Sequence, residues 1–266
     1  MRVGSLFSGI GGMDLGLERA GMEIAWQVEI DDYCRQVLAK HWPDVPRYGD
    51  IKELRGDELE PVDLLVGGPP CQPVSVAGKR QGAGDDRWLW GEALRIVGHI
   101  RPRWCLFENP SGIISMGLDD ILSALEAWGY ACRTVTIPAC SVGAPHRRDR
   151  VWVVADRDGK RTSRQQACWA RGHGRRPNDC GETGGGETRP PESSVGRVLD
   201  GLPSALDCCW PAGPGDEQHD WEPPRLARGI PNRTKRLKAL GNAVVPAVVE
   251  VIGRAIMAAD EGGTPR

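Results

Sequence analysis

The 266-residue chain lacks the long hydrophobic runs, the paired cysteines and the excess of positive charge that mark several protein classes. No apolar run approaches the ~20 residues that span a bilayer, so we expect no membrane segment. The nine cysteines include no C-x₂-C pair, and the Cys and His spacings match no standard zinc pattern, so we predict free thiols and no metal site. No secretory signal is recognisable, so we expect a cytoplasmic location. The net charge is -2, so any nucleic-acid site must be local.

The chain also lacks the G-x-G-x-x-G pattern of dinucleotide-binding proteins. Residues 2–7 are predicted to form a strand, residues 8–12 a glycine-rich turn and residues 13–20 an amphipathic helix. The third glycine of that pattern would fall on Asp14, which disfavours a pyrophosphate ligand. A strand, a glycine turn and a helix are nevertheless the usual opening of a nucleotide-binding sheet. The alternative is a loop that only turns the chain.

Acidic residues follow the next two predicted strands. Glu29 ends the strand over residues 23–28, where it could accept hydrogen bonds from both ribose hydroxyls. Asp50 follows a short strand over residues 45–48 and could bind an adenine amino group, with Ile51 packed on the ring. For Glu29 a solvated surface acid is the alternative. Together these residues indicate an adenosine-type ligand without a pyrophosphate.

A single cysteine lies at the tip of a stiff turn. A predicted buried strand over residues 63–66 runs into Gly67-Gly68-Pro69-Pro70, and Cys71 comes next. Glycine permits unusual backbone angles, whereas proline fixes φ and removes an N–H donor. A thiol on such a rigid turn is a candidate nucleophile. The alternative is a small buried residue in an ordinary turn.

Three further segments carry charged candidates. The polar segment over residues 75–87 is predicted to be a mobile loop that closes over a substrate. Glu108 follows a predicted strand over residues 103–107; if this strand neighbours the Cys71 strand, its carboxyl could have a raised pKa and donate a proton. The arginines of residues 147–150 precede a strand over residues 151–155 and indicate an anion or base contact. The alternatives are a capping or solvated acid and a charged surface turn.

The composition changes at Asp156, after which the chain is rich in Gly, Pro and Arg and loses its periodicity. Apolar periodicity returns in a predicted terminal helix over residues 247–259. We therefore expect a catalytic and cofactor-binding domain over residues 1–155, a small irregular domain with a nucleic-acid face over residues 156–235, and a C-terminal unit over residues 236–266.

Six motifs in this order resemble those of the bacterial and phage DNA (cytosine-5) methyltransferases. They are Phe7-Ser8-Gly9-Ile10-Gly11-Gly12, Gly49-Asp50-Ile51, Gly68-Pro69-Pro70-Cys71-Gln72-Pro73, Glu108-Asn109, Arg148-Asp149-Arg150 and Gly241-Asn242-Ala243-Val244. The resemblance implies an α/β fold: the mostly parallel, Rossmann-like sheet of S-adenosylmethionine-dependent methyltransferases, with a small irregular target-recognition domain. It also implies that the last helix packs back on the catalytic domain.

The resemblance implies a mechanism. Cys71 would add to carbon 6 of a cytosine swung out of the duplex, Glu108 would contact ring N3 and the exocyclic amine, and Arg148 would hold the base carbonyl. Arg150 would support the loop and Glu108. The expected S-adenosyl-L-methionine site comprises Phe7, Gly9, Ile10, Gly11, Gly12, Glu29, Ile30, Asp50, Ile51, Pro69, Leu89, Asn242 and Val244. The expected DNA contacts are Gln72, Ser75, Lys79, Arg80 and Arg87.

The sequence therefore predicts a sequence-specific DNA cytosine-5 methyltransferase that acts as a monomer on double-stranded DNA. It would be part of a restriction–modification system, with a cognate endonuclease acting separately, or a solitary phage enzyme. A tRNA cytosine-5 methyltransferase and a catalytically silent DNA-binding relative are the alternatives. The chain departs from the family pattern at Val74, Pro110 and His146, and the motif that usually precedes Gly-Asn has no clear counterpart.

Overall fold

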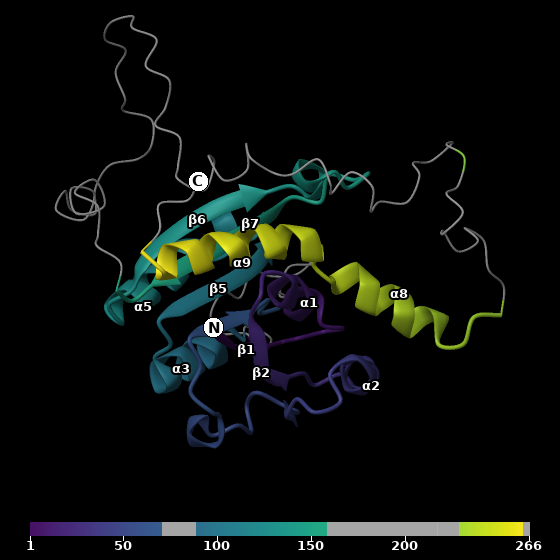
Figure 1. The fold of residues 1–266 in the computed structure, drawn as a ribbon, viewed down its shortest axis with the longest axis horizontal. Helices are drawn as coiled ribbons and strands as arrows, with labels where there is room; N and C mark the ends of the chain where they lie inside the picture. Colours follow the sequence, from purple (N-terminus) through teal and green to yellow (C-terminus); the bar gives the residue numbers. More distant parts are fainter. Residues whose placement is uncertain (71–88, 159–216, 218–228, 263–266) are drawn as a thin grey trace, which may run out of the picture.

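A seven-stranded sheet forms the centre of the protein (Figure 1). The computed structural model describes residues 1–70, 89–158, 217 and 229–262, and all that follows concerns these residues. The strands are β1 (Arg2–Leu6), β2 (Glu23–Val28), β3 (Arg47–Tyr48), β4 (Leu64–Gly67), β5 (Trp104–Pro110), β6 (Ala131–Ile137) and β7 (Arg150–Asp156). Their order is β3-β2-β1-β4-β5-β7-β6, and β7 alone runs in the direction opposite to the other strands. The predicted mostly parallel sheet is confirmed.

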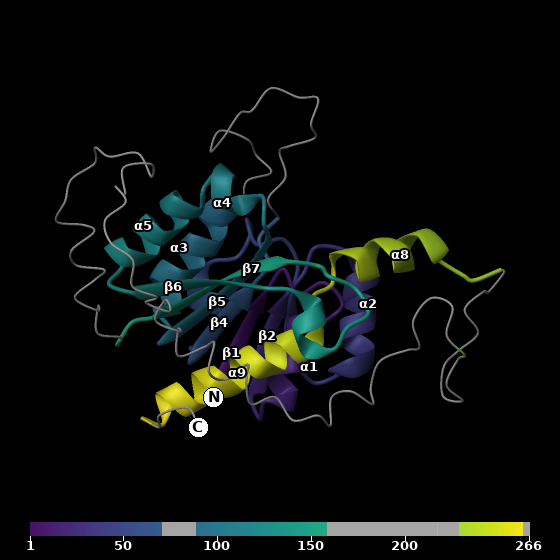
Figure 2. The ribbon, with the colours of Figure 1, turned by 90° about the horizontal axis from the view of Figure 1, so that it is seen from above.

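Helices cover both faces of this sheet (Figure 2). The α-helices are α1 (Gly12–Arg19), α2 (Asp32–His41), α3 (Trp90–Ile100), α4 (Ile113–Met116), α5 (Leu118–Ala127), α8 (Arg233–Asn242) and α9 (Pro246–Asp260), with short 3₁₀ turns at η1 (Gly56–Glu58) and η3 (Ala139–Val142). Figure 2 shows α3, α4 and α5 on one side of the strands and α1 and α9 on the other.

The central strands are apolar throughout because successive side chains enter different cores. In β4, Leu65 faces the core under α3 and α5, whereas Leu64 and Val66 face the core under α1 and α9. In β5, Phe107 faces the core under α3 and α5, and Leu106 faces the core under α1 and α9. A strand buried on both faces reads as a continuous apolar run, which is why these strands were recognisable in the sequence.

The last helix, α9, packs against α1. The two helices approach so closely that a Cβ on Gly16 would lie 2.5 Å from the carbonyl oxygen of Pro246. A Cβ on Gly253 would lie 2.9 Å from the Cβ of Ala20. The two glycines therefore allow the C-terminal helix to complete the core of the N-terminal sheet.

Among the described residues, one 28-residue stretch, Arg233–Asp260, is long and apolar enough to cross a membrane by length and composition. It consists of two helices, α8 and α9, separated by extended backbone at Ala243 and Val245. The apolar side chains of α9 lie in the core with α1 and the sheet. We therefore attribute the high hydropathy of this stretch to the part that α9 has in the protein core.

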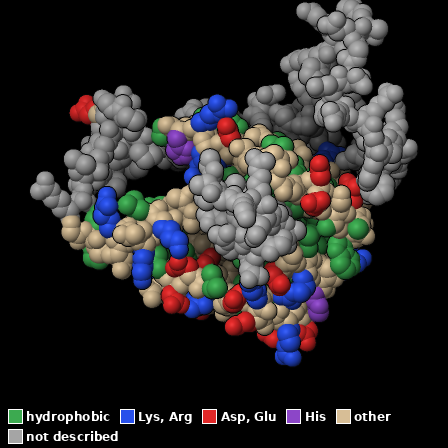
Figure 3. All heavy atoms as spheres, turned by 180° about the vertical axis from the view of Figure 1, so that it is seen from behind, with side chains coloured by type: hydrophobic (Ala, Val, Ile, Leu, Met, Phe, Trp, Pro, Cys, Tyr) green, Lys and Arg blue, Asp and Glu red, His purple; other side chains and the backbone are tan. Residues whose placement is uncertain are grey.

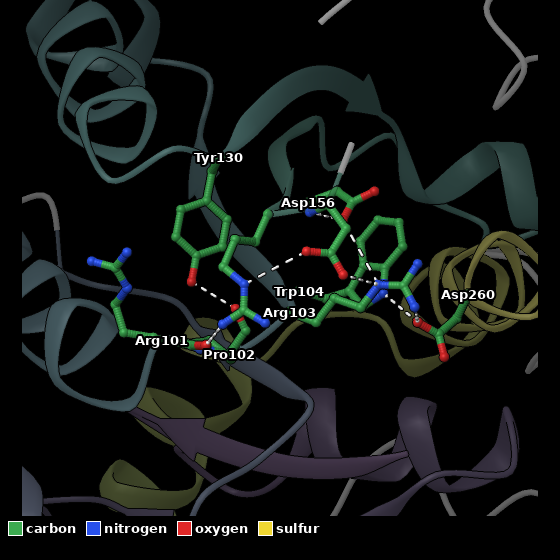
Figure 4. Close-up of polar contacts among 9 residues, drawn as sticks. Arg101, Pro102, Arg103, Trp104, Tyr130, Asp156 and Asp260 are labelled. Atoms are coloured by element: carbon green, nitrogen blue, oxygen red, sulfur yellow. Dashed lines mark hydrogen bonds and ion pairs between the residues drawn. The ribbon is translucent and has the colours of Figure 1, made fainter. Parts of the chain in front are cut away.

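A cluster of polar contacts joins the C-terminal end of α9 to the start of β5 (Figure 4). Nη1 of Arg103 lies 2.5 Å from Oδ1 of Asp260, and Nε1 of Trp104 donates to the same oxygen at 2.9 Å. Arg103 also lies near Asp156, at 3.9 Å, and Asp158, at 3.6 Å. These contacts lie at the end of β5 opposite to Glu108, so they stabilise the fold and leave the candidate site untouched.

Candidate active site

A cavity of about 700 Å³ opens at the carboxyl ends of β1, β2, β4 and β5, the edge at which open α/β sheets bind ligands. Twelve of the thirteen predicted cofactor residues line it: Phe7, Gly9, Ile10, Gly12, Glu29, Ile30, Asp50, Ile51, Pro69, Leu89, Asn242 and Val244. Gly11 does not line it. Its left-handed backbone, with φ of 83°, packs against Trp42, where a Cβ would lie 2.3 Å from the ring.

The glycine turn between β1 and α1 has an unusual backbone. Phe7 and Gly9 are left-handed, with φ of 53° and 57°, and the amide of Gly11 donates to the carbonyl oxygen of Ser8 at 2.9 Å. Gly11 is the N-cap of α1, and no side chain caps the helix there. The first N–H groups of α1 are therefore available for a polar or anionic ligand group.

Glu29 is held in place by the turn itself. Its Oε2 accepts from the amide of Gly9 at 2.7 Å, and its Oε1 accepts from the amide of Asp31 at 2.8 Å. The side chain is half-buried and lines the cavity, in contrast to a freely solvated surface acid. Each carboxylate oxygen can accept a further hydrogen bond, so the predicted ribose contact is compatible with this geometry.

Glu108 lies at the wall of the same cavity. β4 and β5 are neighbours, as the prediction for Glu108 required, and the residue is only 8% exposed. A Cβ on Gly68 would lie 3.2 Å from Oε2 of Glu108, so the glycine makes room for the acid. Burial raises the pKa of Glu108, whereas the positive charges of Arg150 and Arg148 oppose that shift. The Glu108 carboxyl is therefore suited to holding a proton.

Asn109 connects the turn after β4 to β5. Its Nδ2 donates to the carbonyl oxygen of Pro69 at 3.0 Å, and its Oδ1 accepts from Nε1 of Trp90 at 3.3 Å. Asn109 belongs to one of the six motifs, but its side chain had no predicted role. These contacts hold the Pro69-Pro70 turn, which leads to Cys71, against the strand that carries Glu108.

Arg148, just before β7, and Arg150, the first residue of β7, have different partners. Nε of Arg150 lies 2.7 Å from Oε1 of Glu108. Nη2 of Arg148 donates to the carbonyl oxygens of Gly241 and Ala243, at 2.9 and 2.6 Å. Both arginines line the cavity. Arg148 therefore joins the region around Glu108 to the α8–α9 junction.

Several predicted residues lie outside the described part of the chain. They are Cys71 and the expected DNA contacts Gln72, Ser75, Lys79, Arg80 and Arg87. Most of the predicted recognition domain also lies outside it, so the domain boundaries stay predictions. The described residues contain no cluster of three or more metal-ligating side chains.

Sequence reasoning missed the helix α8, which forms one wall of the cavity. Every residue of α8 except Ala239 is exposed, and Lys235 and Lys238 line the cavity. Nζ of Lys238 lies 3.4 Å from Oδ2 of Asp31. Basic side chains gather at this end of the molecule, at the left of Figure 3. The run Arg233, Lys235, Arg236 and Lys238, with no acid between, was the only signal in the sequence.

The family model for C-5 cytosine-specific DNA methylases matches residues 1–177. The chain belongs to this family. S-adenosylmethionine is the methyl donor of these enzymes, as predicted.

Curated relatives include the type II methyltransferase M.AquIA of Picosynechococcus sp., 37% identical over 178 residues, which are 59% of this chain and 72% of the relative. M.FnuDI of Fusobacterium nucleatum is 38% identical over 162 residues, 59% of this chain and 47% of the relative. Among solved structures, an E. coli prophage protein described as a DNA modification methyltransferase is 28% identical with a TM-score of 0.50, over 59% of this chain and 46% of that one. S. pombe Dnmt2, 23% identical with a TM-score of 0.53 over 61% of this chain and 52% of that one, shares the fold. The chain thus spans about half the length of most of these proteins.

Proposed function

We propose that this protein transfers a methyl group from S-adenosylmethionine to carbon 5 of a cytosine that has been swung out of duplex DNA. The observation that carries the proposal is the buried ion pair of Glu108 and Arg150 at the wall of a cavity that the residues predicted to bind adenosine also line. A carboxyl that can hold a proton, beside a guanidinium, matches the N3, amine and carbonyl groups along the pairing edge of cytosine.

The cavity residues fit the methyl donor. Glu29 presents carboxylate oxygens for the ribose hydroxyls, and the uncapped start of α1 suits the carboxylate of the methionine part. Phe7 and Leu89 line the cavity with apolar surface. Bound there, S-adenosylmethionine would supply an electrophilic methyl group on a sulfonium sulfur.

The protein's own residues would make carbon 5 of the cytosine nucleophilic. The Cys71 thiolate adds to carbon 6 and forms an S–C6 bond, while protonated Glu108 neutralises the charge that develops on N3. After alkylation, carbon 5 loses its proton to a base and the thiolate leaves, which restores the ring. Cytosine is inaccessible to this chemistry inside a duplex, so the base must be flipped.

We further propose that Arg150, in contact with Glu108, holds the base carbonyl. The family resemblance assigned this role to Arg148. Nη2 of Arg148 instead donates to two carbonyl oxygens at the α8–α9 junction. Nε of Arg150 lies 2.7 Å from Glu108, the acid that would bind the same base.

The proposal is tested by trapping. Duplex DNA that carries 5-fluorocytosine should form a covalent adduct with the wild-type protein in the presence of S-adenosylmethionine, because fluorine blocks the proton loss that releases the thiolate. Cys71→Ala should form none. An adduct on tRNA alone would establish the RNA enzyme, and no adduct on any substrate would favour a silent DNA-binding relative.

We also propose that the enzyme is sequence-specific and that residues 156–235 recognise the target. We propose that it acts as a monomer and is paired with a separate endonuclease. Bisulfite sequencing of a host genome that expresses the protein should show one methylated motif. Unchanged methylation would contradict a sequence-specific enzyme.

A further inference from the structure

A buried carboxylate that the proposed mechanism does not use lies beneath the glycine turn. Asp14, in α1, has no exposed surface. Its Oδ1 accepts from the hydroxyl of Ser5 at 2.6 Å, and its Oδ2 accepts from Nε2 of Gln27 at 2.7 Å. Ser5 lies in β1 and Gln27 in β2, so the carboxylate joins the helix to the two strands whose ends form the cofactor cavity.

The same hydrogen bonds continue into the turn. The hydroxyl of Ser8 lies 2.9 Å from the Ser5 hydroxyl and 3.1 Å from the Ser5 carbonyl oxygen, and the Ser8 amide donates to the carbonyl oxygen of Val28 at 3.1 Å. Ser8 lies between Phe7 and Gly9, which are both left-handed and line the cavity. Because a left-handed conformation is unfavourable for a residue such as Phe7, surrounding contacts must hold the turn in shape.

The charge on Asp14 does not favour the fold. Burial raises the pKa of Asp14 from 3.8 to about 6. Between these values the folded protein holds a proton that the unfolded chain has released, so stability falls as the pH rises towards 6. Oε1 of Gln27 has no hydrogen-bond partner among the described residues, so the site is not fully satisfied either. The Asp14 charge lowers stability at neutral pH, so stability does not explain its presence. Its hydrogen bonds lead through Ser5 to Ser8, in the turn at the cavity wall, which points to a role in binding.

One charged group, Glu18, shifts the pKa of Asp14 in addition to burial and hydrogen bonds. On α1, Glu18 lies nearest along the helix and raises the pKa of Asp14 further. On α2, burial raises the pKa of the Cys34 thiol to about 11, so it stays protonated. On α9, which packs against α1, Glu250 and Arg254 pair with each other at 2.7 Å. In β1 and β2 the contacts of Asp14 are the neutral Ser5 and Gln27.

We propose that Asp14 is a positioning residue for the cofactor, whose ionised carboxylate acts through Ser5 and Ser8 to hold the glycine turn in its binding conformation. The inference rests on the proposed function, since it takes S-adenosylmethionine as the ligand of the turn. Protonation of Asp14 turns a charge-assisted hydrogen bond into a weaker neutral one. The protonated carboxyl then presents an O–H donor to the NH₂ donor of Gln27, so the Gln27 amide must rotate. Cofactor affinity should therefore fall as the pH drops below 6.

The test compares the full-length wild type with Asp14→Asn by calorimetric titration of S-adenosylmethionine and of the neutral product S-adenosylhomocysteine. At pH 8 both ligands should bind Asp14→Asn about fivefold more weakly, the size expected from one weakened charge-assisted hydrogen bond. Wild-type affinity should fall by a similar factor between pH 7 and pH 5, whereas the affinity of Asp14→Asn should change less. Amide hydrogen exchange over residues 7–12 should be faster in the variant.

Two controls separate positioning from other effects. Glu18→Gln removes a carboxylate from the same helix and retains an oxygen that can accept from Nε1 of Trp42, so it should bind both ligands like the wild type. The melting temperature of Asp14→Asn at pH 8 should equal or exceed that of the wild type, because the buried charge is gone.

Wild-type affinity in Asp14→Asn would overturn the inference, as would a loss confined to the sulfonium ligand, which would indicate attraction by charge alone. A melting temperature that falls together with affinity would indicate a purely structural residue. If the wild type binds neither ligand at any pH, the proposed function fails instead.

Discussion

The ion pair of Arg150 and Glu108 allows a prediction about both rate and stability. Arg150→Met keeps an unbranched apolar stem and removes the positive charge beside a carboxyl that is only 8% exposed. Arg150 opposes the rise that burial causes in the pKa of Glu108, so its loss should raise that pKa further. If protonated Glu108 is the active form, the decline of methylation at high pH should move to higher pH in the variant, while the maximal rate falls.

The magnitude follows from the burial of the pair. Breaking a fully buried ion pair costs about 3–5 kcal/mol. Here the Arg150 side chain is 21% exposed, and Glu108 can take up a proton. We therefore expect a loss of about 2 kcal/mol at pH 7. The loss should be larger at pH 8 than at pH 5, because the unfolded carboxyl ionises while the folded one resists ionisation.

The assay is a pH series of methyl transfer, together with chemical denaturation at pH 5 and pH 8. Arg150→Lys keeps a positive charge and should retain most of the stability. Arg147→Met removes an arginine that is 82% exposed and should change neither the stability nor the pH profile. A pH profile of Arg150→Met that coincides with that of the wild type would refute a proton-donating role for Glu108.

Four further variants test the fold and the DNA interface. Gly16→Ala should destabilise the protein by about 2 kcal/mol because its Cβ would lie 2.5 Å from the Pro246 oxygen. Gly91→Ala has open space around its Cβ and should stabilise the protein by about 0.5 kcal/mol. Thermal melts compare the two variants. Asp260→Asn weakens the α9 cluster and should lower stability by about 1 kcal/mol without changing cofactor affinity in the same titration. The double variant Lys235→Glu with Arg236→Glu should bind DNA more weakly and with a salt slope lower by about 2, as measured by fluorescence anisotropy, if α8 contacts backbone phosphates; an unchanged slope would exclude that contact.

Local signals in the sequence were strong enough to place most elements. The predicted bounds of β2 match the structure residue for residue. Asp31 then caps α2 by accepting from the amides of Tyr33 and Cys34. The helix α8 was missed because only Ala239 on it is buried, so it has no apolar stripe to recognise. Strand β3 proved shorter than expected, with two residues.

The candidate site was predictable in its members but not in its contacts. Gly9, Glu29 and Asp50 follow strands that are parallel neighbours, so sequence order alone brings them to one edge. Asn109 and Asp14 were given no role because their partners belong to other elements: Pro69 to the turn after β4 and Gln27 to β2. Asp14 entered the sequence analysis only as the residue that breaks a glycine pattern.

The amino-acid sequence by itself determined which chemical groups are present, the strand ends that carry them and the family to which the chain belongs, because turn residues and apolar periodicity act over a few neighbouring positions. Only the tertiary structure decided that Glu108 pairs with Arg150, that Arg148 binds the α8–α9 junction and that Asp14 is buried beneath the glycine turn. These contacts depend on strand order and on the antiparallel insertion of β7 beside β5. Such arrangements arise from packing the whole sheet between its helices, and no local pattern encodes them.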